Sequence, residues 1–187
     1  AYISAIEDWK IAETNGQAKV NLAVIDMTQD TINTIKNINI EEELNSWITK
    51  YCLCQVTLCN ITDWVGSPPA SGTEHLIAKG LEAISKKILH GEAVALGTII
   101  ATEIQGQRQQ EAIDIFKKLQ INLTLSNFDL TKEDLALALF QGKEKGQKKA
   151  PHHPWAGLSA GFWWSRRRIF YRFARPFIGH GVGRTGT

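Results

Sequence analysis

The sequence lacks a long apolar run of the kind that a membrane-spanning helix requires. The longest candidate, Ala93–Ala101, has nine residues, whereas a span needs roughly 18–20. The first ten residues contain Glu7 and Asp8 and hold no apolar core of signal-peptide length. These absences predict a cytoplasmic protein.

Cysteine is also scarce. The three cysteines, Cys52, Cys54 and Cys59, are odd in number, which argues against a disulfide framework. Their spacing lacks the C-x2-C pairs that are typical of structural zinc sites. We therefore expect small buried apolar residues, with metal or redox chemistry as the alternative.

Alternating strand patterns are missing too, and so is any βαβ unit with a Gly-rich phosphate loop. Apolar residues instead recur at helical spacing. This pattern predicts an all-α bundle of six to eight helices, with Cys54–Cys59 as a possible strand. The expected helices cover residues 1–14, 18–37, 41–58, the segment from Ser71 or Thr73 as cap to about 84, 90–105, 107–119, and 132–140 with Thr131 as cap.

Charge divides the chain into two parts. Residues 1–142 carry a formal charge of −7 and residues 143–187 carry +9, which predicts a helical body and a poorly ordered basic, aromatic tail. Three interpretations of the tail stay open: an extension without an evolved role, an arm for single-stranded nucleic acid, or a membrane-surface segment. The paired His152 and His153 are expected to be exposed to solvent. We expect protease to cut near Lys143–Lys149.

Two histidines, His75 and His90, each lie near an expected helix start and beside a glutamate, Glu74 or Glu92. Neutral imidazole is a good Zn²⁺ ligand. A helix N-terminus, however, carries partial positive charge that opposes a cation, so such a site needs compensating carboxylate. The pair is thus a candidate metal site, and two hydrogen-bonded structural histidines are the alternative.

Three stretches together resemble a known family: Tyr2–Lys10, Ser71–Ile77 with the motif Ser-Gly-Thr-Glu-His, and Leu89–Thr98 with the motif His-Gly-Glu. They are similar to the C-terminal, metal-binding helical domain of the glycerol-1-phosphate dehydrogenase family, within the superfamily of dehydroquinate synthases and iron-containing alcohol dehydrogenases. The resemblance implies that His75 and His90 are ligands of a catalytic Zn²⁺. It also implies NAD(P)-dependent interconversion of dihydroxyacetone phosphate and glycerol 1-phosphate for glycerophospholipid synthesis.

The chain also departs from the family pattern. The family's third ligand, an Asp, precedes the segment that matches Tyr2–Ser4, and the nucleotide-binding half lies outside this sequence. Lys79 stands where many relatives have a second His. No catalytic, substrate-binding or cofactor-binding residue is therefore assigned. The expectation is an isolated chain without activity that needs a separate nucleotide-binding half or a homo-oligomer. The alternative is a non-catalytic helical remnant whose tail binds nucleic acid or a membrane surface.

Overall fold

The computed structural model describes residues 1–42, 44–66 and 68–149, and this part of the chain is helical without a strand. The prediction of an all-α fold is confirmed. None of the described helices is long and apolar enough to cross a membrane. The elements are α1 (Tyr2–Thr14), α2 (Leu22–Asn37), α3 (Leu44–Val65), α4 (Thr73–Ile84), α5 (His90–Gln105), α6 (Gln109–Lys118), the short 3₁₀ helix η1 (Leu125–Phe128) and α7 (Lys132–Lys149).

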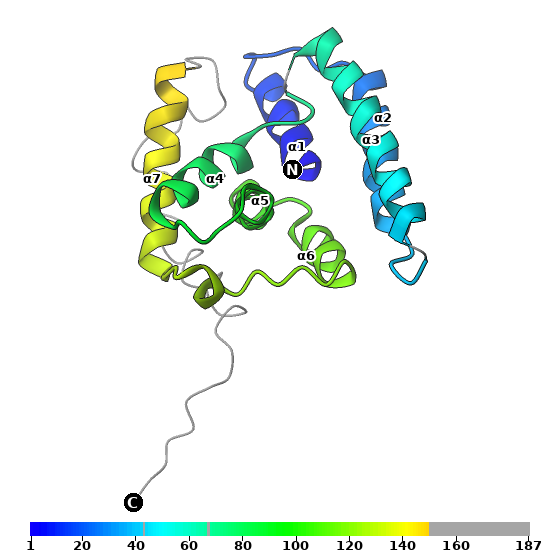
Figure 1. Ribbon diagram of the computed structural model, residues 1–187. Helices are drawn as coiled ribbons and strands as arrows, with labels where there is room; N and C mark the ends of the chain where they lie inside the picture. Colours follow the sequence, from blue (N-terminus) through cyan, green and yellow to red (C-terminus); the bar gives the residue numbers. More distant parts are fainter. Residues whose placement is uncertain (43, 67, 150–187) are drawn as a thin grey trace, which may run out of the picture.

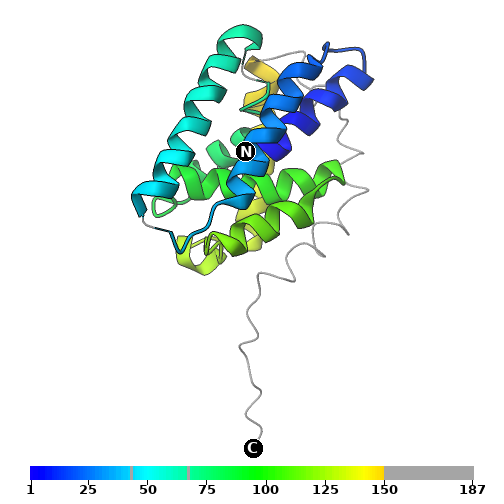
Figure 2. The same ribbon diagram turned by 90° about the vertical axis from the view of Figure 1, so that its right-hand side faces the viewer.

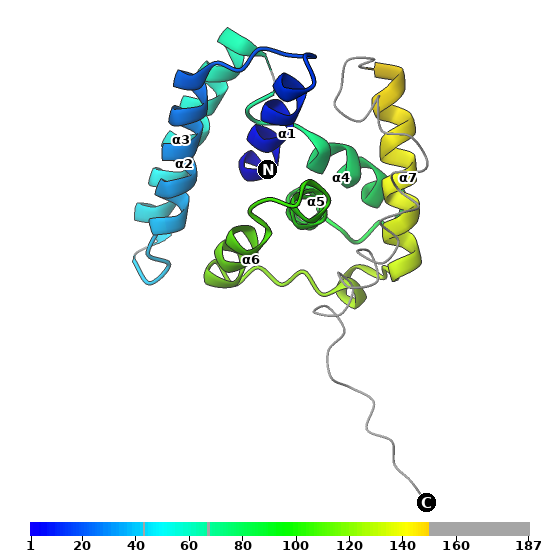
Figure 3. The ribbon, with the colours of Figure 1, turned by 180° about the vertical axis from the view of Figure 1, so that it is seen from behind.

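Helix α5 occupies the centre of the molecule. Figure 1 shows it end-on, with α1, α4 and α6 around it, and the view from behind in Figure 3 gives the same arrangement. Helix α7 packs on α4 at one side, while α2 and α3 pair with each other at the other side (Figure 1). In the orthogonal view, α5 and α6 run side by side (Figure 2). Helices α4 and α5, which carry both candidate histidines, are therefore held from several directions.

The largest apolar core joins α4, α5, η1 and α7. Leu81, Leu96 and Leu135 are almost completely buried in it. Two glycines allow the close approach of these helices. A Cβ on Gly80 would meet the backbone of Ala138, and a Cβ on Gly97 would lie 2.5 Å from the backbone oxygen of Glu74. Two smaller clusters attach α1 to α2, α3 and α6.

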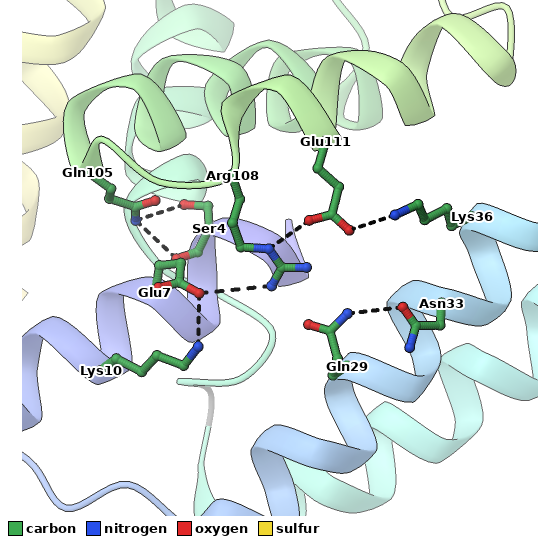
Figure 4. Close-up of polar contacts among 9 residues, drawn as sticks. All are labelled: Ser4, Glu7, Lys10, Gln29, Asn33, Lys36, Gln105, Arg108 and Glu111. Atoms are coloured by element: carbon green, nitrogen blue, oxygen red, sulfur yellow. Dashed lines mark hydrogen bonds and ion pairs between the residues drawn. The ribbon is translucent and has the colours of Figure 1, made fainter.

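Polar side chains tie α1 and α2 to the α5–α6 corner (Figure 4). Arg108 donates to Glu111 at 2.8 Å and lies 3.9 Å from Glu7, while Lys36 reaches Glu111 at 3.3 Å. Arg108 occupies the left-handed region with φ of 55°, directly before the start of α6. These contacts fix α1 against the end of α5.

Several sequence-based boundaries were wrong. Cys54–Cys59 is no strand, since α3 continues unbroken to Val65. Only Cys54 of the three cysteines is buried, because Cys52 and Cys59 lie on the solvent face of that helix. Helix α2 begins at Leu22 with the Asn21 side chain accepting from the Val24 N–H.

The two ends that involve a predicted Thr cap had different outcomes. At α7 the prediction is confirmed: the Asp134 carboxylate accepts from the Thr131 N–H at 2.8 Å, and the Asp134 N–H donates to the Thr131 hydroxyl at 3.2 Å. The helix then runs beyond the expected end at Phe140, to Lys149. At α4 the N-cap is Gly72 without a side-chain cap, so neither Ser71 nor Thr73 has the predicted role.

Candidate functional site

The fold brings the two candidate histidines together. His75 lies in the first turn of α4 and His90 is the first residue of α5, and their ring centroids are 5.7 Å apart with an interplanar angle of 49°. Two imidazoles on one tetrahedral Zn²⁺, with Zn–N of about 2.0–2.1 Å, have centroids roughly 5–6 Å apart. Solvent reaches both side chains, at 23% relative exposure for His75 and 62% for His90.

A carboxylate contacts Nδ1 of each ring. Glu74 Oε1 lies 2.8 Å from His75 Nδ1, and Glu82 Oε1 lies 2.6 Å from His90 Nδ1. An ionised carboxylate only accepts hydrogen bonds, so the ring nitrogen is the donor in each contact. In a neutral imidazole, Nε2 then carries the lone pair. In that tautomer, Nε2 of each ring is the nitrogen that is free to accept a ligand.

Two acidic side chains accept hydrogen bonds at the N-terminus of α4. Asp8 Oδ2 of α1 accepts from the Thr73 N–H at 2.6 Å, and Glu74 Oε1 accepts from the Gly72 N–H at 2.7 Å. Residue 72 must be glycine, because a Cβ there would collide with the Asp8 carboxylate. The positive end of the helix dipole faces these carboxylates, which answers the electrostatic objection to a cation at this helix start.

The two acids beneath His75 differ in protonation. Burial, followed by the charge of Glu74, raises the pKa of Asp8 to about 7. Burial also acts to raise the pKa of Glu74, but its hydrogen bonds to His75 and Gly72 and the charges nearby leave it below the ordinary value. Two like charges this close disfavour joint ionisation. Near neutral pH, Glu74 is therefore charged while Asp8 is partly protonated.

Gln105, at the end of α5, completes this buried polar cluster. Its side-chain amide donates to Asp8 Oδ1 at 2.8 Å and to the Ser4 carbonyl at 3.0 Å, and Figure 4 shows its approach to Ser4. Three buried oxygens in the cluster, Thr73 Oγ1, Glu74 Oε2 and Gln105 Oε1, have no hydrogen-bond partner within the described part of the chain. The cluster links α1, α4 and α5 directly beneath His75.

The donor set fits a divalent metal in part. Two imidazoles with carboxylates behind them match the preferred ligands of Zn²⁺. Across residues 1–42, 44–66 and 68–149, no group of three His, Cys, Asp or Glu side chains is placed to hold a metal ion. Asp8 contributes to the helix start rather than to a ligand set. The candidate site therefore consists of two imidazoles without a third ligand in the described part of the chain.

Sequence reasoning missed two contributors to the site, Glu82 and Gln105, and gave Asp8 no structural role. Glu82 follows His75 by seven residues, which places both on one face of a helix. This spacing was the sequence feature that could have indicated Glu82 as part of the site. The partners of Asp8 and Gln105 come from helices far apart in sequence, so no local pattern reveals them.

Several sequence-based candidates lie outside the described residues. They include the whole basic, aromatic segment 150–187 with His152 and His153. The same segment contains one Gly-x-Gly-x-x-Gly spacing, at Gly181–Gly186. The nucleic-acid and membrane interpretations of this segment stay predictions.

Comparison with known proteins finds relatives named glycerol-1-phosphate dehydrogenase [NAD(P)+]. The chain is 32% identical over 143 residues to a glycerol-1-phosphate dehydrogenase [NAD(P)+] of Thermoplasma volcanium, covering 73% of this chain and 40% of the relative. Proteins of the same name from Thermoplasma acidophilum and Hyperthermus butylicus are 31% and 30% identical, over 73% and 74% of this chain and 40% and 41% of the relatives. The chain thus spans about two fifths of the length of these relatives. No protein-family model matches it.

Proposed function

We propose that residues 1–149 form the metal-binding helical part of a glycerol-1-phosphate dehydrogenase, because the chain is related by sequence to that family. The relatives are named as NAD(P)+-dependent, and the reaction proposed here is the interconversion of dihydroxyacetone phosphate and glycerol 1-phosphate. In this proposal His75 and His90 are metal ligands, and the metal is Zn²⁺.

The single observation that supports this assignment best is the arrangement of the two rings. Their centroids are 5.7 Å apart, although the histidines are fifteen residues apart in sequence, and each Nδ1 contacts its own carboxylate. Structural histidines need hydrogen bonds but have no reason to face one another from two helix starts. Convergence of two imidazoles that keep Nε2 for a ligand is the arrangement of a metal site.

The chemistry divides between the metal and the protein. A bound divalent metal supplies a Lewis acid that polarises the substrate oxygen. His75 and His90 hold the ion at the surface where α4 and α5 meet. Glu74 and Glu82 orient the two rings, and Asp8 with Gln105 fixes the start of α4 beneath them. A third ligand and the nicotinamide cofactor would come from residues outside 1–149 or from another polypeptide.

Isothermal titration calorimetry with Zn²⁺ tests this proposal. We expect the full chain to bind one ion at this site, and expect His75→Ala and His90→Ala each to weaken that binding at least tenfold, because one imidazole alone is an inadequate site. The matched control is the double variant H152A/H153A, which removes two imidazoles elsewhere in the chain and should bind as the wild type does. Unchanged binding by both single variants would contradict the proposal and assign the ion to other residues.

A second expectation concerns activity. The 187-residue chain alone should not oxidise glycerol 1-phosphate with NAD⁺ or NADP⁺, because the described residues hold no group of three side chains placed to bind a metal ion and no cofactor site is assigned to them. The absorbance of the reduced nicotinamide, followed with pure chain and added Zn²⁺, measures this. Turnover that His75→Ala abolishes would show that the chain itself supplies the remaining parts.

A further inference from the structure

The carboxylates behind the two rings differ in their surroundings. Glu74 is completely buried and also accepts from the Gly72 N–H at 2.7 Å, so it is part of the helix start as well as a partner of His75. Glu82 is partly exposed, at 33% for its side chain, and its hydrogen bond is to His90. Within the described part of the chain, Glu82 therefore has no evident role in the fold apart from this contact.

The exposed pair of Glu82 and His90 is not explained by a contribution to stability. His90 is 62% exposed, and exposed ion pairs contribute little to stability. The contact at 2.6 Å between Glu82 Oε1 and His90 Nδ1 nevertheless does to His90 what buried Glu74 does to His75: it holds a proton on Nδ1 and restricts rotation of the ring. The same arrangement thus occurs twice at the site, once in a buried and once in an exposed setting.

We propose that Glu82 and Glu74 are positioning residues, which fix His90 and His75 in the Nδ1–H tautomer so that both Nε2 atoms are available to one divalent cation. This inference rests on the proposed metal site and adds a role for two side chains that bind no metal themselves. Carboxylates that accept from a ligating imidazole raise its basicity and orient its ring, and their loss typically costs about 10–100-fold in metal affinity.

Glu82 is the better residue to change, since removal of the buried Glu74 would also release the Gly72 N–H and disturb α4. Glu82→Ala leaves a residue of high helix propensity on α4. Glu82→Gln keeps an oxygen that can accept from Nδ1–H but removes the charge. Glu41→Ala, at an exposed glutamate between α2 and α3, is the matched control.

Two measurements on the full chain test the inference. Long-range ¹H–¹⁵N correlation spectra of the metal-free protein report which ring nitrogen of His90 is protonated. Calorimetry with Zn²⁺ reports affinity. We expect mainly Nδ1–H in the wild type and in Glu82→Gln, a loss of that preference in Glu82→Ala, and a roughly 10- to 100-fold weaker Zn²⁺ affinity for Glu82→Ala. The Zn²⁺ affinity of Glu82→Gln should lie between those of the wild type and Glu82→Ala. Glu41→Ala should match the wild type in both measurements.

The results separate this inference from the proposed function. If His90→Ala removes Zn²⁺ binding but Glu82→Ala changes neither the tautomer nor the affinity, the metal site stands and the positioning role is overturned. If the wild type binds no Zn²⁺ at His75 and His90, the proposed function fails, whereas the tautomer spectra still decide whether Glu82 holds the ring. An equal loss of affinity in Glu41→Ala would also overturn the positioning role, because the effect would then not be specific to the His90 contact.

Discussion

Asp8 is the residue whose chemistry is most altered by the fold. It lies on α1, is 5% exposed, and accepts from Thr73 and Gln105 across three helices. Burial and the charge of Glu74 raise its pKa to about 7 from an ordinary 3.8. Between about pH 4 and pH 7, Asp8 therefore stays protonated in the folded state but is ionised in the unfolded state.

This shift predicts a pH dependence of stability. Because the pKa of Asp8 is raised in the folded state, its protonation stabilises the fold fully below pH 3.8, and that contribution is lost as pH rises through about 7. Between about pH 6 and pH 8.5 we expect the Asp8 contribution to fall by about 1 kcal/mol. Urea unfolding of the wild type and of Asp8→Asn at both pH values measures this.

The comparison between the two proteins isolates Asp8 from other titrating groups. The amide that replaces the carboxyl group in Asp8→Asn stays neutral, so the variant should lose less stability over this range than the wild type. Parallel losses in both proteins would show that Asp8 does not titrate there.

At this scale the sequence indicated the two histidines but not their supports. His75 and His90 could be chosen because of their position near helix starts, and the structure places their rings together. Whether they bind metal remains a prediction. Asp8 and Gln105 could not be found, since their contact joins residues 97 positions apart, and only the packing of α1 against α5 creates it.

At the level of elements, the contact between α4 and α5 determines the distance between the rings. Gly97 lies on α5 against the backbone oxygen of Glu74, the residue directly before His75. A methyl group at position 97 would force the helices apart, because this contact is with backbone that cannot move alone. Overpacking of this kind costs about 1–3 kcal/mol.

We therefore predict that Gly97→Ala lowers the free energy of unfolding by about 1–3 kcal/mol and weakens Zn²⁺ binding several-fold by changing the ring separation. Gly91→Ala on the same helix is the control: a Cβ there meets nothing within 4 Å, and the gain in helix propensity should raise stability by up to about 1 kcal/mol. Urea unfolding and calorimetry on both variants give the comparison. If the two substitutions have the same effect, close approach at Gly97 does not set the site.

Helices were easier to predict than their ends. The long amphipathic segments, such as α5, and the Thr131–Asp134 cap of α7 follow from local spacing. The start of α4 does not, because its N–H groups are satisfied by Asp8 from another helix and by Glu74 rather than by a local Ser or Thr. The alternation at Cys54–Cys59 resembled a strand, but burial of Cys54 and Leu58 with exposure on the opposite side is a helical pattern within α3.

On the scale of the whole molecule, the three apolar clusters draw their buried residues from positions 3–139. The candidate site and the polar contacts of Figure 4 lie within the same range. The described interactions around the site thus lie within residues 3–139. The division into a helical body and a basic tail at residue 142 stays a prediction, and α7 runs across it.

From this we predict that a chain ended at Lys149 keeps its helical circular dichroism. Its Zn²⁺ affinity should lie within about threefold of that of the full chain, a difference in binding free energy below about 1 kcal/mol. Far-ultraviolet spectra and calorimetry on both chains test it. Loss of helix or of binding on removal of 150–187 would mean that this segment contributes to the body.

Zinc K-edge X-ray absorption tests whether His75 and His90 bind one metal ion. The sample is the H152A/H153A variant loaded with one equivalent of Zn²⁺, so that imidazole scattering cannot come from that pair. We expect two imidazole ligands at about 2.0–2.1 Å with the remaining ligands oxygen, and we expect His75→Ala/His90→Ala on the same background to lose the imidazole signal. Sulfur scattering at about 2.3 Å would instead place the ion on the cysteines of α3 and rule out His75 and His90 as its ligands.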